Sequence, residues 1–401
     1  MTRPRQLQIV DPRERVIVRA ADAALGVVSS IARPFTRHVQ PHDPRRILLL
    51  RLERIGDLLM ALPAIRDVRS LAPAAQIDLV VGSWNADLAR AIPFVNRVLT
   101  LDAKWLARDG TGLGVAPLLS EARRWRTAKY DVAINFEPDV RSNLLLAVSG
   151  AAWTAGWTSG GGGPVLDQAL DFDPGSHTTA NARRLIRAVL GEAPPESGGA
   201  FLAIPDAALR AASLRLRETD GRGTLVALHV SGGRPIKQWD LDRFTEVAAR
   251  LVDTRGARIV LTGSRGDRLL VDHVRTALPT RAVIDAAGDI DLLELAALLT
   301  KVDLLITGDT GPMHLAAAVG TPVVAVFGPS DPARYAPAER IHRIVRVDLP
   351  CSPCNRIRQP PARCIGHTPD CLTGVSSAAV LDAALSVLDS VQPRLTRAGR
   401  S

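Results

Sequence analysis

Short apolar runs alternate with longer helical stretches from Arg45 to about residue 347, and this alternation is the strongest constraint on the fold. Strands as apolar as these, separated by helices, are typical of a parallel sheet covered on both faces. A segment rich in Gly, Pro and Ser, from Gly150 to about Glu196, breaks the alternation, which restarts at Thr224. A chain of 401 residues is also too long for one typical core. We therefore expect an α/β protein with two doubly wound, Rossmann-like domains.

The alternation and its break divide the chain into four parts. These are a basic N-terminal extension (1–44), a first domain (45–200), a second domain (201–375), and a C-terminal helix with a tail (376–401) that crosses back to the first domain. The expected strands are 46–52, 76–81, 97–101, 130–136, 224–230, 258–262, 282–285, 302–307, 322–327 and 341–347. The expected helices are about 14–35, 58–71, near 87, 118–126, 207–217, 241–254, 292–300, after 312, and 376–391. Ligands bind at the carboxyl ends of strands in such sheets, so we expect the two domains to face each other across a substrate cleft.

The charge balance favours acidic partners. The net charge is +9 with a pI near 10.2, but residues 1–46 hold nine Arg against four Asp or Glu, a local +5 that leaves +4 for the rest. Nucleic acid is disfavoured as the partner, because no run of Lys or Arg with interleaved aromatic residues follows and only 4% of residues are aromatic. Phosphorylated substrates or an anionic membrane remain.

The N-terminal region does not resemble a signal peptide. Its longest uncharged run, Ala23 to Ala32, is short and closes on Arg33 and Pro34. The longer uncharged stretch from Ser142 to Leu166 is too polar and too broken by glycine to span a bilayer. We therefore expect a cytoplasmic protein.

The N-terminal stretch 14–35 has the period of an amphipathic helix. Its apolar stripe and the charged side opposite are formed by Ile17, Ala21, Ala24, Val28, Ile31 and Phe35, and by Arg15, Arg19, Asp22 and Arg33. Two interpretations stay open: a helix that lies on an anionic membrane face, which would make the protein peripheral to the inner face of the cell membrane, or a helix packed on the first domain.

A strand-to-helix turn at residues 308–314 has the outline of an anion site. The apolar strand ends in Gly308, and the helix that follows opens with Pro312 in its first turn. Glycine permits close approach of the backbone to a ligand, and the amides at a helix start favour negative charge. The residues that we expect to bind a phosphate or diphosphate here are Asp309, Thr310, Gly311, Pro312, Met313 and His314.

The first strand of the first domain ends in a second chemically suggestive turn. Arg51 follows the strand, and Gly56 and Asp57 come directly before the helix. An Asp at this place is most often a helix cap. A carboxylate that faces a cleft, with Gly and Arg around it, is also suited to act as general base on a hydroxyl, and we favour that role.

The second domain opens with a strand and a small-residue loop that carries two cations. Ser231, Gly232, Arg234 and Lys237 lie in this loop, where the cations suit phosphate oxygens. Lys237 and the helix start at 309–314 follow strands of the same sheet, so together they would neutralise a diphosphate leaving group. Gly263, after the next strand, marks a weaker candidate loop at the same edge.

All four cysteines fall within the Pro-rich loop 351–371. Cys351, Cys354, Cys364 and Cys371 suggest a structural four-thiolate site for Zn or Fe. Two disulfides are the alternative, which a reducing cytoplasm disfavours.

Together these blocks resemble glycosyltransferase family 9, the heptosyltransferases of bacterial lipopolysaccharide core assembly, over roughly residues 45–390. The matching blocks, in order, are Arg51-x-x-x-Ile-Gly-Asp57 with Leu62-Pro-Ala64, Lys237-x-Trp239, Gly308–His314 with Phe327–Pro332, and the Cys-rich loop. The resemblance implies a GT-B fold and inverting transfer of a heptose from an ADP-activated donor to a glycolipid or glycan acceptor, without a catalytic metal.

The resemblance also implies roles for single residues. Asp57 becomes the base, Lys237 holds the donor phosphates, and Glu137 and Arg141 match a looser segment on the acceptor side with Arg51 and Gly56. The sequence departs from the family at Arg265, where an acidic residue is expected near the donor ribose, which puts the nucleotide in doubt. Two alternatives stay open: a GT-B enzyme that uses a UDP-sugar, such as an epimerase or N-acetylglucosaminyltransferase, and a non-catalytic nucleotide-binding scaffold.

Overall fold

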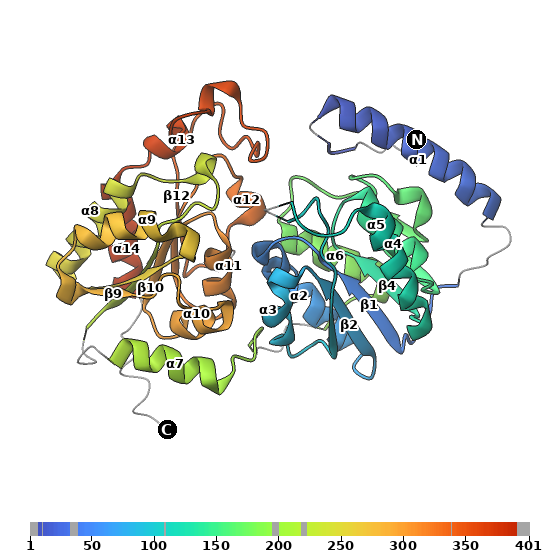
Figure 1. Ribbon diagram of the computed structural model, residues 1–401, viewed down its shortest axis with the longest axis horizontal. Coiled ribbons are helices and arrows are strands. Elements are labelled where there is room, and N and C mark those ends of the chain that lie inside the picture. The colour runs from blue at the N-terminus through green and yellow to red at the C-terminus, as the bar shows by residue number, and fades with distance from the viewer. Residues whose placement is uncertain are drawn as a thin grey trace. The chain divides into compact units, whose positions relative to one another are not determined.

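The protein folds into two compact units, Met1–Phe201 and Leu202–Ser401 (Figure 1). The structure is a computed structural model that describes residues 7–9, 11–32, 39–107, 110–194, 200–217, 223–337 and 339–390. Each unit is built on one six-stranded sheet with helices on both of its faces. The expectation of two Rossmann-like α/β domains is therefore confirmed.

The sheet of the first unit has the order β3-β2-β1-β4-β5-β6, and every neighbouring pair is parallel. Its strands are β1 (Arg46–Leu50), β2 (Gln76–Val81), β3 (Arg97–Thr100), β4 (Val132–Asn135), β5 (Trp153–Trp157) and β6 (Gln168–Leu170). Its helices are α2 (Ile55–Leu71), α3 (Ala86–Arg90), α4 (Val115–Arg124), α5 (Val140–Val148) and α6 (Thr178–Leu190). Helices α2 and α6 pack together, and so do α4 and α5.

The second unit repeats this plan with the order β12-β11-β10-β7-β8-β9, again parallel throughout. Its strands are β7 (Leu225–His229), β8 (Arg258–Thr262), β9 (Val283–Asp285), β10 (Leu304–Gly308), β11 (Val323–Val326) and β12 (Arg343–Val345). Its helices are α7 (Asp206–Arg217), α8 (Leu241–Arg255), α9 (Arg268–Thr276), α10 (Leu292–Leu299), α11 (Gly311–Ala318), α12 (Pro332–Tyr335), α13 (Asp370–Thr373) and α14 (Ser377–Ser390).

Both sheets have the strand order of dinucleotide-binding folds. In each unit the first strand lies beside the fourth, with the second and third on one side and the fifth and sixth on the other. Where the connections leave in opposite directions, a crevice opens at the carboxyl ends of the strands, and ligands bind there. This switch point lies between β1 and β4 in the first unit and between β7 and β10 in the second.

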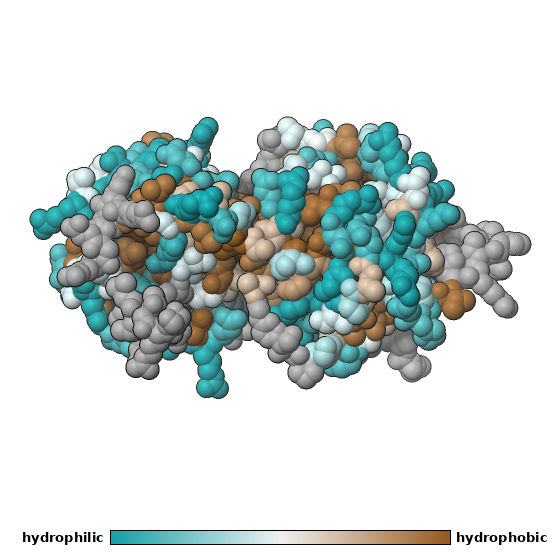
Figure 2. All heavy atoms as spheres, turned by 90° about the horizontal axis from the view of Figure 1, so that it is seen from below, coloured by the Kyte–Doolittle hydropathy of each residue, from teal (hydrophilic) through white to brown (hydrophobic). Residues whose placement is uncertain are grey.

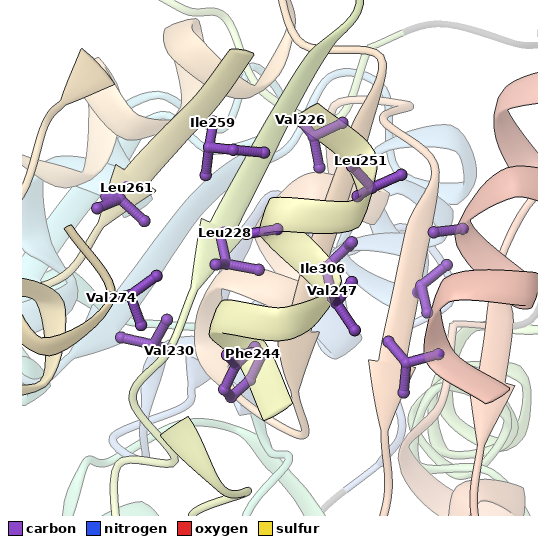
Figure 3. Packing of buried hydrophobic residues seen from close by; sticks show 14 of the residues in the cluster. Val226, Leu228, Val230, Phe244, Val247, Leu251, Ile259, Leu261, Val274 and Ile306 are labelled. Carbon is purple, nitrogen blue, oxygen red and sulfur yellow. The ribbon is translucent and has the colours of Figure 1, made fainter. Parts of the chain in front are cut away.

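The core of the second unit forms where α8 lies against the sheet (Figure 3). The helix has apolar residues at helical spacing, and Phe244, Val247 and Leu251 are fully buried against side chains that alternate along β7, such as Val226 and Leu228. Burial of each such side chain stabilises the fold by about 1.5–3 kcal/mol. This packing holds the carboxyl edge of β7 in a fixed place.

The C-terminal helix α14 packs on the second unit, and the expected crossing of residues 376–401 to the first domain stays a prediction. Val380, Ala384 and Val387 form an apolar stripe at positions i, i+4 and i+7. They are buried in the same core as α8 and lie against β10, β11 and β12.

The expected strands and helices are all present among the described residues, with ends that differ by a few residues. The segment 150–196, which we interpreted as a break, contains β5, β6 and α6, and α5 and α9 were also missed. Gly160 explains part of this error, since a Cβ there would lie 1.8 Å from Pro138 O. The glycines serve one tight loop between two strands and do not mark a linker.

Figure 2 shows hydrophilic and hydrophobic residues interspersed over the face it presents. Among the residues whose placement is described, no helix is long and apolar enough to cross a membrane.

The N-terminal helix α1 (Pro12–Ala32) contacts the first unit at the loop between β5 and β6. Val18 is buried there, and the Asp22 carboxylate accepts the N–H of Gly162 at 2.6 Å. Ile17, which we expected on the apolar stripe, is exposed. Arg33 and Phe35 lie outside the described residues, and so do the side chains of Val28 and Ile31.

Candidate active site

Arg51 organises the switch point of the first unit. It follows β1 and is buried, and its Nη1 donates to the carbonyl of Phe136, directly after β4, at 2.7 Å. The same guanidinium lies 2.6 Å from Glu53 Oε2 and 3.6 Å from Asp57 Oδ1, and its Nε donates to the Asp57 carbonyl at 3.1 Å. A single buried cation therefore ties the turn after β1 to the end of β4.

Asp57 caps a helix and is also accessible to a substrate. It is the third residue of α2, one position after Gly56, and its Oδ2 accepts the backbone N–H of Arg54 at 3.2 Å, so the carboxylate caps the helix. Its side chain is nevertheless 30% exposed, which leaves it accessible to a substrate hydroxyl. The cap and the proposed base are thus the same group.

Glu137, after β4, is a buried carboxyl in an electronegative setting. Burial raises its pKa well above the ordinary value, and the nearby Glu53 and Asp139 raise it further, while Ser142 and Arg51 act in the opposite direction. Its Oε2 is buried without a hydrogen-bond partner among the described residues. The group therefore favours the neutral, protonated form at a place next to Arg51.

Arg141 is engaged within its own segment. Both its Nε, at 2.9 Å, and its Nη2 donate to the Asp139 carboxylate, and its Cζ lies 4.4 Å from the ring centroid of Trp105. Two buried amides that the sequence did not single out hold this region together. Asn135 donates to Glu137 O and to Asn143 Oδ1, both at 2.8 Å.

Lys237 and Asp309 form the central contact of the second unit. Lys237 Nζ lies 2.8 Å from Asp309 Oδ2, and both side chains are mostly buried. Burial alone would raise the pKa of Asp309, but Lys237, Ser330 and His314 together hold it below the ordinary value. The pair joins the loop after β7 to the segment after β10, across the switch point of the second sheet.

The backbone of the Lys237 loop is fixed by its neighbours. The Gln238 side chain accepts the N–H of Gly232 at 2.8 Å and donates to Val230 O at 2.7 Å. A Cβ on Gly232 would lie 2.6 Å from the carbonyl carbon and oxygen of Lys237, so only glycine fits. Trp239 is buried and donates to Val375 O at 3.1 Å.

Two other predicted residues of the second unit lie near this loop. Arg234 is exposed just before the short helix at Pro235–Lys237. Gly263 follows β8, and its carbonyl accepts the N–H of Gly288 at 2.9 Å.

Helix α11 starts at the strand-to-helix turn that the sequence predicts. Thr310 is its N-cap residue, Gly311 and Pro312 open the first turn, and the Thr310 hydroxyl lies 3.0 Å from that of Thr307. His314 is largely buried, and Met313 is completely buried. Met313 can therefore offer a ligand only its backbone amide, which narrows its expected role.

The sequence interpretation missed a polar group at the end of β7 and β8. His229 Nδ1 lies 3.2 Å from Thr262 Oγ1, and burial lowers the pKa of His229 to about 4. Burial works to raise the pKa of Asp267, but Ser264, Ser231 and His229 hold it below its ordinary value. An acidic residue thus stands two positions after Arg265, in the loop where we expected one.

The four cysteines are free and gather around Cys371. Burial raises the pKa of the Cys371 thiol to about 11, and the neighbouring Cys354, Cys351 and Cys364 add to the effect. No group of three or more His, Cys, Asp or Glu in the described parts of the chain is arranged so that it could hold a metal ion. The thiols therefore fit a four-thiolate site in composition and proximity, but not in ligand geometry.

A comparison with known families decides what class of protein carries these sites. Residues 119–363, more than half of the chain, match glycosyltransferase family 9 (heptosyltransferase). The chain belongs to glycosyltransferase family 9. The resemblance seen in the motifs is confirmed, and the chain is a transferase. The match includes Lys237 and the start of α11, whereas the Asp57 turn lies before it.

Curated relatives of this family 9 chain cover most of its length. A lipopolysaccharide heptosyltransferase 1 from Pseudomonas aeruginosa is 27% identical, over 77% of this chain and 86% of its own length. A lipooligosaccharide heptosyltransferase 2 from Haemophilus ducreyi is 23% identical, over 75% of this chain and 88% of its own length.

Solved structures show the same fold. A family 9 glycosyl transferase from Veillonella parvula has a TM-score of 0.74 at 24% identity, covering 86% of this chain and 98% of its own. The ADP-heptose heptosyltransferase II of E. coli has a TM-score of 0.69 at 20% identity, covering 86% of this chain and 99% of its own. An iron-containing dodecameric glycosyltransferase from enterotoxigenic E. coli is more distant, with a TM-score of 0.53 at 17% identity, covering 88% of this chain and 78% of its own.

Proposed function

We propose that this family 9 enzyme transfers a heptose from an ADP-activated donor to a lipopolysaccharide-core or similar glycolipid acceptor, with inversion at the anomeric carbon. Curated relatives over three quarters of the chain are named as heptosyltransferases. The observation that carries the proposal is the Lys237–Asp309 pair beside the start of α11, at the switch point where such sheets bind nucleotides.

The second unit provides for the leaving group. As the bond between the anomeric carbon and the β-phosphate oxygen breaks, its electron pair and the negative charge pass to the departing ADP. Lys237 and the amides at the start of α11 stabilise that growing charge, and such electrostatic stabilisation is usually the largest single contribution to catalysis. Asp309 keeps the ammonium of Lys237 in place for this task. The proposal requires no metal ion for the reaction.

The first unit provides for the nucleophile. Asp57 takes the proton of the acceptor hydroxyl while the hydroxyl oxygen forms the new bond to the anomeric carbon. This single displacement inverts the configuration at that carbon. Arg51 holds the Asp57 carboxylate from one side and the end of β4 from the other. Glu137 and Arg141 are proposed to line the acceptor side.

The donor nucleotide is the point to test. Purified enzyme is incubated with a lipid A-core acceptor and either ADP-heptose or UDP-N-acetylglucosamine, and products are followed by mass spectrometry. We expect an added heptose and released ADP, with no change in the presence of EDTA. Turnover of the UDP-sugar alone would identify a GT-B enzyme that uses UDP-sugars. Binding of ADP-heptose without turnover with any acceptor would identify a non-catalytic scaffold.

The four-cysteine loop is proposed to close on a structural Zn or Fe ion. Four free thiols lie in this one loop, and the loop is tied to residues after β11 by Ser352 Oγ, which donates to Gly328 O at 2.7 Å, and by Cys354 N, which donates to Pro329 O at 3.1 Å. The ion would supply a rigid cross-link and no chemistry. Elemental analysis of protein purified under reducing conditions should find one ion per chain. The structural ion would be excluded if no metal is found and all four thiols are alkylated without a chelator.

The acceptor also bears on location. A lipid-linked acceptor is reached from the cytoplasmic side only if the enzyme works at the inner face of the cell membrane, and we propose that location. Fractionation of cells should find the enzyme partly with membranes and released by high salt, since electrostatic attachment weakens with ionic strength.

A further inference from the structure

Helix α1 carries apolar residues on two opposite sides. One side faces its own unit, where Val18 is only 7% exposed and Leu25 is half-buried. A Cβ on Gly161 would lie 2.3 Å from Val18 Cγ1, which shows how closely the helix approaches the loop between β5 and β6. This side accounts for the attachment of the helix to the protein.

The opposite side is apolar as well, although it faces solvent. At about 100° per residue, Val16, Ala20, Ala23 and Val27 lie within about 40° of the direction opposite Val18. Val16 is 66% exposed and Val27 is 60% exposed, and at the edge of this side Ile17 is 67% exposed. A helix on a protein surface ordinarily turns polar residues outward, so this face indicates a partner.

The charges around this face select the partner. Arg13 and Arg19 are exposed on α1, and residues 1–46 carry a net +5. Pairing with a second copy would bring like arginines together around the contact. An anionic bilayer instead accepts the aliphatic side chains among its acyl chains and the guanidinium groups among its phosphates.

We propose that the Val16, Ile17, Ala20, Ala23 and Val27 face of α1 docks the protein on an anionic membrane surface. This deepens the proposed function, on which it rests for the lipid-linked acceptor, by naming the surface that makes the contact. Docking would hold the first unit at the bilayer through a short chain of contacts. Gly162 N donates to Asp22 of α1, and Gly160 O accepts the N–H of Val140, three residues after Glu137.

Flotation with vesicles tests the surface without requiring catalysis. The full-length protein, Ile17→Glu/Val27→Glu, and Leu214→Glu/Leu269→Glu are mixed with vesicles of phosphatidylethanolamine with 30% phosphatidylglycerol, or of phosphatidylcholine alone. The control pair adds the same charge at exposed aliphatic positions of α7 and α9, which are 62% and 85% exposed. We expect wild type and the control to float with the anionic vesicles, and the partition of the α1 variant to fall at least about tenfold.

The same proteins are assayed for donor turnover with a soluble acceptor fragment, which separates the two proposals. Unchanged turnover with lost flotation supports the docking face, and normal flotation of an inactive enzyme counts against the proposed function alone. Flotation of Ile17→Glu/Val27→Glu equal to wild type overturns the docking proposal. So does wild-type protein that does not float but sediments as a dimer which the α1 variant dissociates, because the face then joins two copies.

Discussion

Lys237 Nζ and Asp309 Oδ2 lie 2.8 Å apart and join two loops that are 72 residues apart in the chain. Because Gly232 and Gln238 fix the backbone on one side and α11 begins two residues after Asp309 on the other, the ammonium has little freedom. A cation held in advance costs no reorganisation when the leaving group develops its charge. The contact therefore holds the Lys237 ammonium in advance in the position where the proposed reaction needs it.

Replacement of Lys237 by Ala should lower kcat/KM by about 10²–10³-fold, since a preorganised charge partner of the leaving group is removed. The change also leaves a buried Asp309 without its cation, at a cost of about 1–3 kcal/mol in stability. Lys237→Ala/Asp309→Asn should regain that stability but not the activity. Lys301→Ala, which removes a lysine of the same unit before β10, is the control. A double variant with near wild-type kcat/KM would refute the phosphate role.

Asp57 can be tested so that its cap and its chemistry separate. Asp57→Asn retains an acceptor for the Arg54 N–H and preserves the cap, whereas Asp57→Ala loses it at about 1 kcal/mol. If Asp57 is the base, both variants lose about 10²–10⁴-fold in kcat while donor affinity by calorimetry stays unchanged. Activity retained by Asp57→Asn and lost by Asp57→Ala would show that the residue only caps α2.

Much of the fold was predictable because parallel strands buried on both faces leave nearly continuous apolar runs. β7, β8 and β10 are of this kind, and they end in His229, Thr262 and Gly308, a polar residue or a glycine at the edge of the sheet. β5 was not predictable in this way. Its residues, Trp153–Trp157, include a Gly and a Thr, and the glycine loop that follows resembles a linker until Gly160 is seen packed on Pro138.

The site was predictable where chemistry follows a strand end, as with Arg51 and Lys237. Pairings between loops were not, because residue spacing says nothing of which side chains meet across a sheet. Lys237 and Asp309 were both expected to contact the donor, and only the structure shows that they hold each other. His229 was missed because a lone histidine in an apolar strand resembles ordinary core.

Glu137→Gln should stabilise the protein at neutral and alkaline pH. The pKa of Glu137 is raised, so the native protein retains a proton that the unfolded chain releases, and its free energy of unfolding falls as pH rises through that window. Gln has the same shape and cannot ionise. The melting temperature of Glu137→Gln should exceed that of wild type at pH 8, and the difference should shrink towards pH 5. Glu121→Gln, on the surface of α4, should show no such trend; an equal trend there would contradict the assignment.

His229 should make the protein sensitive to mild acid. Its pKa falls from 6.5 to about 4 on folding, because burial disfavours the charged ring. Between these values the unfolded chain binds a proton that the native protein does not, so the free energy of unfolding decreases as pH falls. Above pH 6.5 this loss of stability is absent. As pH falls from 6.5 towards 4, the free energy of unfolding decreases by about 1.4 kcal/mol per pH unit, up to about 3 kcal/mol in all. The free energy of unfolding, measured with urea from pH 7 to 4.5, should therefore depend less on pH for His229→Gln than for wild type. His273→Gln, which removes an exposed histidine of α9, should follow wild type, and parallel curves for wild type and His229→Gln would show that His229 does not set this dependence.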